Sequence, residues 1–264
     1  MKIINIIIFI FLAGKINAQE IVNIPKNNLT RNLSLHTNLG FSSITDRQIS
    51  EYTYFGTTTC LGLSYFKMYQ TFGSFFRLNY ENGSNIEYEN TSAATYNILL
   101  SYGKVYPVKG INLFGNDLQT YMGPSSDIYF HLRTQNASLN IMAPTFSYAL
   151  LFSLSFNTIV VYPINSLLAC EGDFSVTAIS FGSRFPNIVS EQINLFKLLP
   201  FYKALRNSDR IALVYRPYGF LQLKAGYEFN FFGIKSFEDS TESTDWASLR
   251  SLNNLSFIEI DFKF

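Results

Sequence analysis

The chain ends in the ten residues Leu255–Phe264, which read Leu-Ser-Phe-Ile-Glu-Ile-Asp-Phe-Lys-Phe. Counted backwards from the terminus, every second residue is apolar, namely Phe264, Phe262, Ile260 and Ile258. The residues between them are charged, namely Lys263, Asp261 and Glu259. Because side chains alternate between the two faces of a strand, this pattern predicts a strand with one apolar and one charged face. Such a strand fits a soluble sandwich, where a second sheet covers the apolar face, and also a membrane barrel, where lipid covers it.

The same alternation occurs upstream. Between residues 221 and 231, one face is predicted to carry Leu221, Leu223, Ala225, Tyr227, Phe229 and Phe231. The opposite face then carries Gln222, Lys224, Gly226, Glu228 and Asn230. A two-residue repeat over about ten residues is typical of a transmembrane β-strand. Several earlier segments alternate less cleanly, and a change of phase at Ala178 and Ile179 predicts a β-bulge.

The composition favours strands over membrane helices. Aromatic residues make up 17% of the chain and charged residues 15%, whereas soluble domains carry about 25% charged residues. After residue 18, no apolar run approaches the ~20 residues that a membrane-spanning helix needs. The net charge of +1 gives no support for a nucleic-acid partner. The two cysteines, Cys60 and Cys170, are predicted to be two separate thiols, buried or facing the lumen, rather than a disulfide, and with the two histidines they show no metal-ligand spacing.

The first residues have the features of a secretory signal peptide. Lys2 precedes a short apolar stretch, and Ile16 and Ala18 fit a signal-peptidase site. The apolar stretch is too short to span a membrane comfortably. Residues 1–18 are therefore predicted to be removed after export, which leaves residues 19–264 as a single domain.

The alternating segments predict about ten strands, with a range of eight to twelve, at 32–42, 56–68, 74–81, 94–106, 112–134, 144–162, 170–185, 209–216, 219–232 and 250–264. Short joins are predicted at 69–73, 107–111, 163–169 and 217–218, and longer joins at 43–55, 82–93, 135–143, 186–208 and 233–249. Strict alternation of short and long joins is typical of outer-membrane barrels. Segment 112–134 is long for one tilted strand of ~9–11 residues. Residues 188–206 are interpreted as a short helix or an apolar external loop.

The terminal strand, the signal peptide and the alternation of joins together resemble Gram-negative outer-membrane β-barrel proteins of the type found in Bacteroidota. The resemblance implies an antiparallel up-and-down barrel in the outer membrane. It also implies that Phe264 and Phe262 belong to the signal that the barrel-insertion machinery reads. The implied partners are that machinery and outer-membrane lipid, with no cofactor and an unknown ligand.

Charged residues on the inward faces predict a polar network inside the barrel, made of Arg77, Glu81, His131, Arg133, Lys224, Glu228, Glu259 and Asp261. A barrel of about ten strands has a narrow interior, and buried charges must be paired or hydrated. The network is therefore either a salt-bridged plug that fixes the strand register or the lining of a small pore. Of the two, the plug is favoured.

Two functions remain open. The first is a non-enzymatic barrel that acts as a narrow pore, a surface-binding module or a structural membrane component. The second is a lipid or peptide hydrolase that uses His36 or His131. Phospholipase-type and lipid A-deacylase-type barrels place a catalytic serine two residues after the histidine, but here Asn38 and Arg133 occupy those positions. A serine from elsewhere in the sheet, such as Ser34 or Ser64, could still lie near His36. An omptin-type protease needs acidic and histidine groups on the external rim, whereas both histidines lie inside predicted strands.

Overall fold

The computed structural model describes residues 30–46, 53–69, 71–88, 91–113, 115–137, 146–185, 197–201, 203–234 and 249–264. They form one antiparallel sheet whose strands are β1 (Thr30–Asp46), β2 (Thr53–Met68), β3 (Gly73–Tyr88), β4 (Thr91–Leu113), β5 (Asn116–Ala137), β6 (Phe146–Pro163), β7 (Leu168–Phe185), β8 (Lys197–Pro200), β9 (Ala204–Tyr218), β10 (Leu221–Ile234) and β11 (Leu249–Lys263). In this described part of the chain, no helix has the length and apolarity to cross a membrane.

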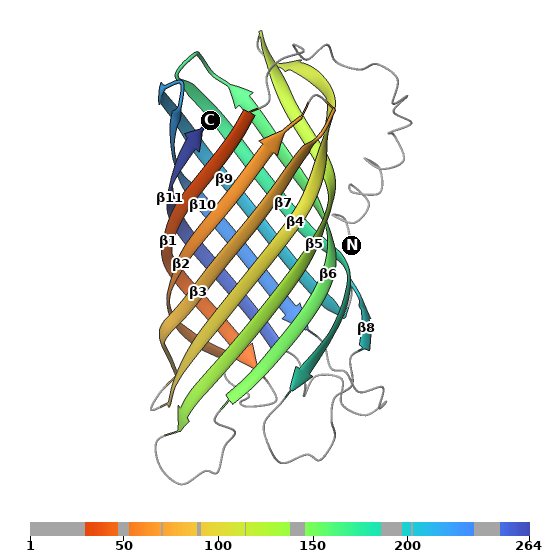
Figure 1. The fold of residues 1–264 in the computed structure, drawn as a ribbon. Coiled ribbons are helices and arrows are strands. Elements are labelled where there is room, and N and C mark those ends of the chain that lie inside the picture. The colour runs from red at the N-terminus through yellow and green to blue at the C-terminus, as the bar shows by residue number, and fades with distance from the viewer. Residues whose placement is uncertain are drawn as a thin grey trace.

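The sheet closes on itself into a barrel (Figure 1). From β1 to β7 and from β9 to β11, strands that follow one another in the chain pair in turn, β9 pairs with β7, and β11 pairs with β1 from Asn32↔Lys263 to Asp46↔Leu249. The first and last strands therefore lie side by side, and all strands are inclined to the barrel axis, as closure requires. The predicted ten-stranded antiparallel barrel is confirmed, because β8 and β9 share one position in the wall.

The shared position follows from the pairing of β7. Its first part pairs with β9, and its later residues Ile179–Gly182 pair with β8. On the other side of β7, Leu154 pairs with Ile179 but Ser155 pairs with Thr177, so Ala178 is the extra residue of the predicted bulge. The interpretation of 188–206 as a helix or loop is wrong for Lys197–Pro200, which form β8, and for residues 204–206, which begin β9. Residues 186–196 lie outside the described residues.

The join between β4 and β5 is a tight turn at Gly115, whose φ of 86° suits glycine, rather than the predicted join at 107–111. Pro107 is instead a strand residue paired with β5. It is tolerated because β3 pairs with β4 only as far as Val105, so β3 needs no donor from Pro107. The predicted strand 112–134 is therefore wrong at its start, because β4 ends at Leu113 and β5 begins only after the turn, at Asn116.

The predicted long join at 82–93 is also wrong. β3 continues to Tyr88 and β4 begins at Thr91, so only two residues separate these strands. Outward-facing positions such as Asn82 and Ser84 are polar here, so the alternation that marks the rest of these strands is lost. Short and long joins consequently do not alternate strictly. We call the end of the barrel that holds Gly115 and Phe264 the turn end, and the opposite end the loop end.

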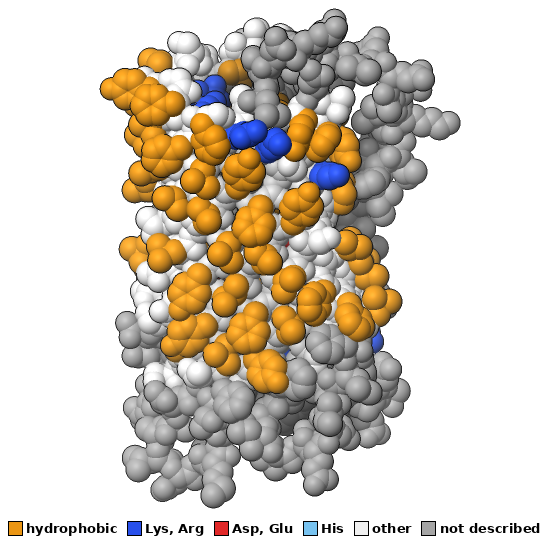
Figure 2. All heavy atoms as spheres, viewed as in Figure 1, with side chains coloured by type: hydrophobic (Ala, Val, Ile, Leu, Met, Phe, Trp, Pro, Cys, Tyr) orange, Lys and Arg blue, Asp and Glu red, His pale blue; other side chains and the backbone are white. Residues whose placement is uncertain are grey.

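The outer face of the barrel is apolar. Large exposed apolar side chains occur on every strand, and Leu39, Leu61 and Ile258 are 63%, 62% and 61% exposed. Hydrophobic side chains cover most of the described surface in Figure 2. A soluble monomer rarely exposes apolar patches of more than a few hundred Å², whereas a lipid-facing barrel carries such a band. Both cysteines are free, as predicted, and Cys60 is buried. The predicted buried or lumenal position is wrong for Cys170, which is exposed and precedes the lumen-facing Glu171.

Candidate functional site

The lumen at the turn end contains a cavity of about 260 Å³, which we call the chamber. Its lining extends from Thr30, Met68 and Lys263 at the rim to His36 deeper in the barrel. Five basic and five acidic side chains line it, namely Arg77, Arg210, Arg216, Lys224, Lys263, Glu171, Asp173, Glu228, Glu259 and Asp261. The charges of the chamber wall are therefore balanced.

Lys224 lies at the centre of a group of three carboxylates. Its Nζ is 2.8 Å from Oε1 of Glu171, 3.2 Å from Oε1 of Glu259 and 3.0 Å from Oδ2 of Asp261. The strand register brings two of these groups together, because Lys224 of β10 pairs directly with Glu259 of β11. Glu259 and Asp261 are buried. The ammonium group offsets the repulsion among carboxylates that have lost most of their hydration.

Two arginines complete the charge pairing of the chamber. Nη2 of Arg210 is 2.6 Å from Oε2 of Glu259, and its guanidinium carbon is 3.6 Å from the centroid of the Phe257 ring. Arg77 forms an ion pair with Asp173 on the opposite side of the barrel. Planar guanidinium groups suit both the ion pair and the aromatic contact. The chamber wall is thus cross-linked by ion pairs between β3, β7, β9 and β11.

His36 faces the chamber from β1. Its Nδ1 is 3.8 Å from Oε2 of Glu259. The ring lies against Gly62 of β2, where an added Cβ would stand 2.0 Å from Cε1 of His36. Glycine is therefore required at this position for the ring to lie against the wall. Ser34 and Ser64 line the same chamber, but among the described residues neither ring nitrogen of His36 has a hydrogen-bond partner.

A layer of amides and carboxylates lies deeper in the lumen. Glu81 accepts hydrogen bonds of 2.9, 3.0 and 3.0 Å from the side-chain amides of Asn97, Asn230 and Asn253. Asn230 also donates to Glu228, at 2.7 Å. A cavity of about 30 Å³ beside this layer has room for roughly one or two water molecules. The layer leaves little free space in the middle of the barrel.

Asp127 is a second buried carboxylate with several donors. It accepts hydrogen bonds from the hydroxyl groups of Ser101, Ser125 and Ser155, which come from β4, β5 and β6. Nη2 of Arg206 lies 2.6 Å from its Oδ2. These donors satisfy both carboxylate oxygens within a wall of small side chains.

At the loop end, Asp46 is buried together with two arginines. Arg184 donates a hydrogen bond to Oδ1 of Asp46, and Ser147 donates to Oδ2 at 3.0 Å. Nη1 of Arg133 lies 3.9 Å from Oδ2, and its guanidinium stacks over the Tyr54 ring at 4.6 Å. The side chains of Asp46 and Arg133 have no exposed surface. We call this group the Asp46 cluster.

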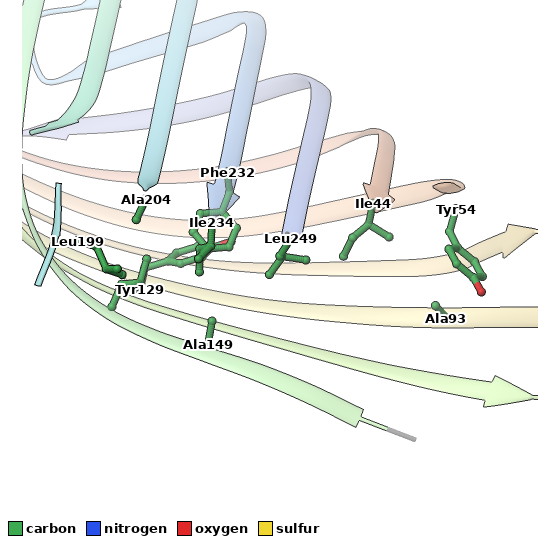
Figure 3. Packing of buried hydrophobic residues seen from close by; sticks show 11 residues of the cluster. Ile44, Tyr54, Ala93, Tyr129, Ala149, Leu199, Ala204, Phe232, Ile234 and Leu249 are labelled. Atoms are coloured by element: carbon green, nitrogen blue, oxygen red, sulfur yellow. The ribbon is translucent and has the colours of Figure 1, made fainter. Parts of the chain in front are cut away.

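Apolar side chains fill the lumen around the Asp46 cluster. They form the apolar layer, which consists of Ile44, Tyr54, Ala93, Tyr129, Ala149, Leu151, Leu199, Ala204, Phe232, Ile234 and Leu249. Figure 3 shows Tyr129, Phe232 and Ile234 grouped inside the barrel, and the first two rings are 4.5 Å apart. None of these residues lines the chamber. The two ends of the lumen therefore differ, with a charged cavity at the turn end and an apolar filling at the loop end.

The residues predicted for the lumen network do not form one site. Arg77, Lys224, Glu228, Glu259 and Asp261 line the chamber. Glu81 belongs to the amide layer, and His131 and Arg133 lie fully buried toward the loop end. The structure brings Lys224, Glu259 and Asp261 into contact, as the pairing of their strands predicts.

Other charged residues of the lumen were missed by sequence reasoning. Asp46 and Arg206 lie in segments predicted to be joins. Arg184 follows the bulge in β7, which shifts the phase of the alternation. Arg210 precedes residues 221–231, the segment in which the alternation of apolar and polar residues is clear. Asp127 could have been found, because it shares the inward phase of His131 and Arg133.

The geometry around the histidines gives limited support for catalysis. His131 has no exposed surface, and its Nδ1 is 2.6 Å from Oδ1 of Asn97. A substrate in the chamber would not reach it, since His131 is not part of the lining. Only His36 lies where a small molecule could approach. The described residues contain no group of three or more His, Cys, Asp or Glu arranged to hold a metal ion.

Comparison with known proteins adds the fold class. No protein-family model matches the chain, and no curated protein sequence matches it. The outer membrane protease OmpT from Escherichia coli has a similar structure, with a TM-score of 0.53 at 10% identity over 93% of this chain and 99% of that chain. The translocator domain of the autotransporter NalP from Neisseria meningitidis gives a TM-score of 0.47 at 9% identity, over 90% and 89% of the two chains. At such identities the likeness concerns the fold alone, which is that of an outer-membrane β-barrel.

Proposed function

We propose that this chain is a non-conducting barrel of the Gram-negative outer membrane, exported as a precursor whose mature form begins at Gln19, and that it serves as a structural or surface-binding component. The apolar exterior supports the membrane location. The first strand and the chain end meet at the turn end, where the backbone N–H of Arg31 donates to the carbonyl of Phe264 at 3.2 Å. In outer-membrane barrels this end faces the periplasm. The chamber would then open toward the periplasm.

The main support for a non-conducting barrel is the filling of the lumen at the loop end. An ion crossing the lumen would have to pass the apolar layer and separate the pairs of the Asp46 cluster. Breaking one buried ion pair typically costs about 3–5 kcal/mol, because the remaining charge is left without a partner. The amide layer around Glu81 lies in the same path. These contacts favour a plug over a pore.

Conductance in planar lipid bilayers tests this proposal. The folded full-length mature protein is added to the bilayer in potassium chloride, with a porin measured in parallel as a positive control. Insertion is verified by recovering heat-modifiable protein from vesicles of the same lipid. We expect no stable conductance steps from inserted protein. Regular steps that persist at low voltage would overturn the proposal in favour of a pore.

One observation favours a second function, a hydrolase that uses His36. The ring lies in the open chamber, close to Glu259, with Ser34 and Ser64 in the same lining. Without a serine in contact with the ring, the nucleophile of such an enzyme is undefined. Turnover of phospholipid and of peptide would be measured for the protein and for its His36→Ala and His131→Ala variants. Activity lost only with His36→Ala would support the hydrolase, whereas no activity in the unmodified protein would reject it.

A further inference from the structure

Three basic side chains form a row on the outside of the barrel near the turn end. Arg31 of β1 pairs with Lys67 of β2, Lys67 pairs with Ser74 of β3, and Ser74 pairs with Lys104 of β4. Neighbouring strands are ~4.8 Å apart, so the row spans about 15 Å. Figure 2 shows several Lys and Arg side chains near the upper end of the face in view, set among hydrophobic side chains. We call Arg31, Lys67 and Lys104 the basic row.

The basic row lacks the acidic partners that basic residues have in the lumen. Among the described residues, none of its three members forms an ion pair, whereas Arg77, Arg184 and Arg210 each have a carboxylate partner. A cation on the lipid face of a barrel costs ~2–4 kcal/mol at the bilayer midplane and ~0–1 kcal/mol near the interface. The row therefore belongs at the interface, where a negative group of the lipid can balance it.

Aromatic rings hold two of the three cations in place. Nζ of Lys67 lies 4.5 Å from the centroid of the Tyr69 ring, and Nζ of Lys104 lies 5.3 Å from that of Phe72. The Tyr69 and Phe72 rings are themselves stacked at 4.5 Å. The turn between β2 and β3 brings the two residues together, since the backbone N–H of Tyr69 donates to the carbonyl of Phe72 at 2.7 Å. The ammonium groups are thus positioned before any ligand binds.

From the basic row toward the middle of the barrel, the type of outward-facing side chain changes from one row of paired residues to the next. One outward position deeper, Tyr65, Phe76 and Tyr102 pair across β2, β3 and β4. At the next outward position, the row of paired residues is Leu63, Leu78 and Leu100. Cations, aromatic rings and aliphatic side chains follow in this order. The phosphate, the glycerol region and the acyl chains of a phospholipid follow in the same order with depth.

We propose that the basic row, with Tyr69 and Phe72, binds the phosphate group of an anionic glycerophospholipid in the leaflet next to the turn end. The proposal rests on the outer-membrane location proposed above. The ammonium groups of Lys67 and Lys104 beside the stacked rings and the guanidinium of Arg31 attract the phosphate to this stretch of the wall, and the rings and leucines below contact the rest of the lipid. Phosphatidylglycerol suits this site, because it carries a net negative charge on its phosphate, whereas the choline group of phosphatidylcholine balances the phosphate charge.

The test measures lipid selectivity in nanodiscs. The folded mature protein is placed in phosphatidylcholine nanodiscs with a small fraction of labelled phosphatidylglycerol, and the ratio of bound to bulk label is compared with that for labelled phosphatidylcholine. We expect a clear preference for phosphatidylglycerol that disappears in the Arg31→Gln, Lys67→Gln, Lys104→Gln triple variant. The single Lys67→Gln variant should lower the preference by roughly fivefold. Arg250→Gln, an exposed position at the loop end, should leave it unchanged.

Two results would overturn the lipid site. The first is equal binding of both lipids by the unmodified protein, and the second is the same preference in the Lys67→Gln variant as in the unmodified protein. The single variant keeps the test decisive if the triple variant does not fold. Heat-modifiable migration of the protein recovered from the nanodiscs shows that it is inserted. Insertion without lipid preference rejects only this site, whereas failure to insert rejects the membrane location itself.

Discussion

At the scale of single residues, the lumen is stabilised by ion pairs between distant parts of the chain. Asp46 and Arg184 are 138 positions apart, and Arg77 and Asp173 are 96 positions apart. Alternation along a strand predicts which side chains face inward, and adjacent strands predict contacts such as Lys224 with Glu259. Contacts across the lumen cannot be predicted in this way, because they depend on the stagger of the strands around the barrel.

Replacing the acidic member of the Asp46 cluster tests the importance of buried pairing. The Asp46→Asn variant removes the buried negative charge that Arg184 and Arg133 both approach at the loop end. We expect the free energy of unfolding to fall by about 3–5 kcal/mol, measured by urea titration of the protein in lipid vesicles. Asp117→Asn is the control, because Asp117 is exposed and, among the described residues, its side chain accepts a single hydrogen bond, of 3.0 Å from Asn112. A control effect within ~0.5 kcal/mol is expected, and equal effects of the two variants would contradict this account of the lumen.

At the scale of the strands, regular alternation allowed reliable prediction and irregular pairing did not. β10, β11 and the bulge at Ala178 follow directly from the two-residue repeat. The split between β8 and β9 has no such signal, because β8 has only four residues. Pro107 suggested a turn, yet it lies in β4, beyond the point where the pairing with the neighbouring strand β3 ends. Whether a proline ends a strand depends on the adjacent strand, which the local sequence does not reveal.

The last strand also carries a testable prediction about assembly. The side chain of Phe264 is 65% exposed on the outside of the barrel, where the insertion machinery could contact it. We expect deletion of Phe264 to reduce sharply the fraction of heat-modifiable protein in the membranes of the producing cells. Phe220→Ser is the control, because this aromatic residue is similarly exposed, at 60%, and also lies at the turn end. If both variants assemble equally well, Phe264 has no special role in insertion.

At the scale of the whole molecule, the barrel combines an apolar exterior with a lumen that holds a charged cavity at the turn end and an apolar filling at the loop end. The apolar face of each strand follows from the sequence, whereas the structure shows that the described strands form a single closed sheet with no second sheet to cover that face. The filling of the lumen at the loop end cannot be predicted from the sequence, since the apolar layer combines side chains from β1, β2, β4, β5, β6, β8, β9, β10 and β11. In the sequence of each strand, these apolar residues occupy inward positions, where the alternation predicts polar residues. Only the closed barrel shows that they meet.

The contact between the exterior and lipid hydrocarbon is tested most directly by placing a charge on it. Ile258 and Ile111 are almost equally exposed, at 61% and 60%, but Ile258 lies in mid-strand and Ile111 near the turn end. The free energy of folding into lipid vesicles is measured for Ile258→Lys and Ile111→Lys. We expect a loss of ~2–4 kcal/mol for Ile258→Lys and ~0–1 kcal/mol for Ile111→Lys. Small and equal losses, together with solubility of the protein without detergent, would contradict a barrel surrounded by lipid.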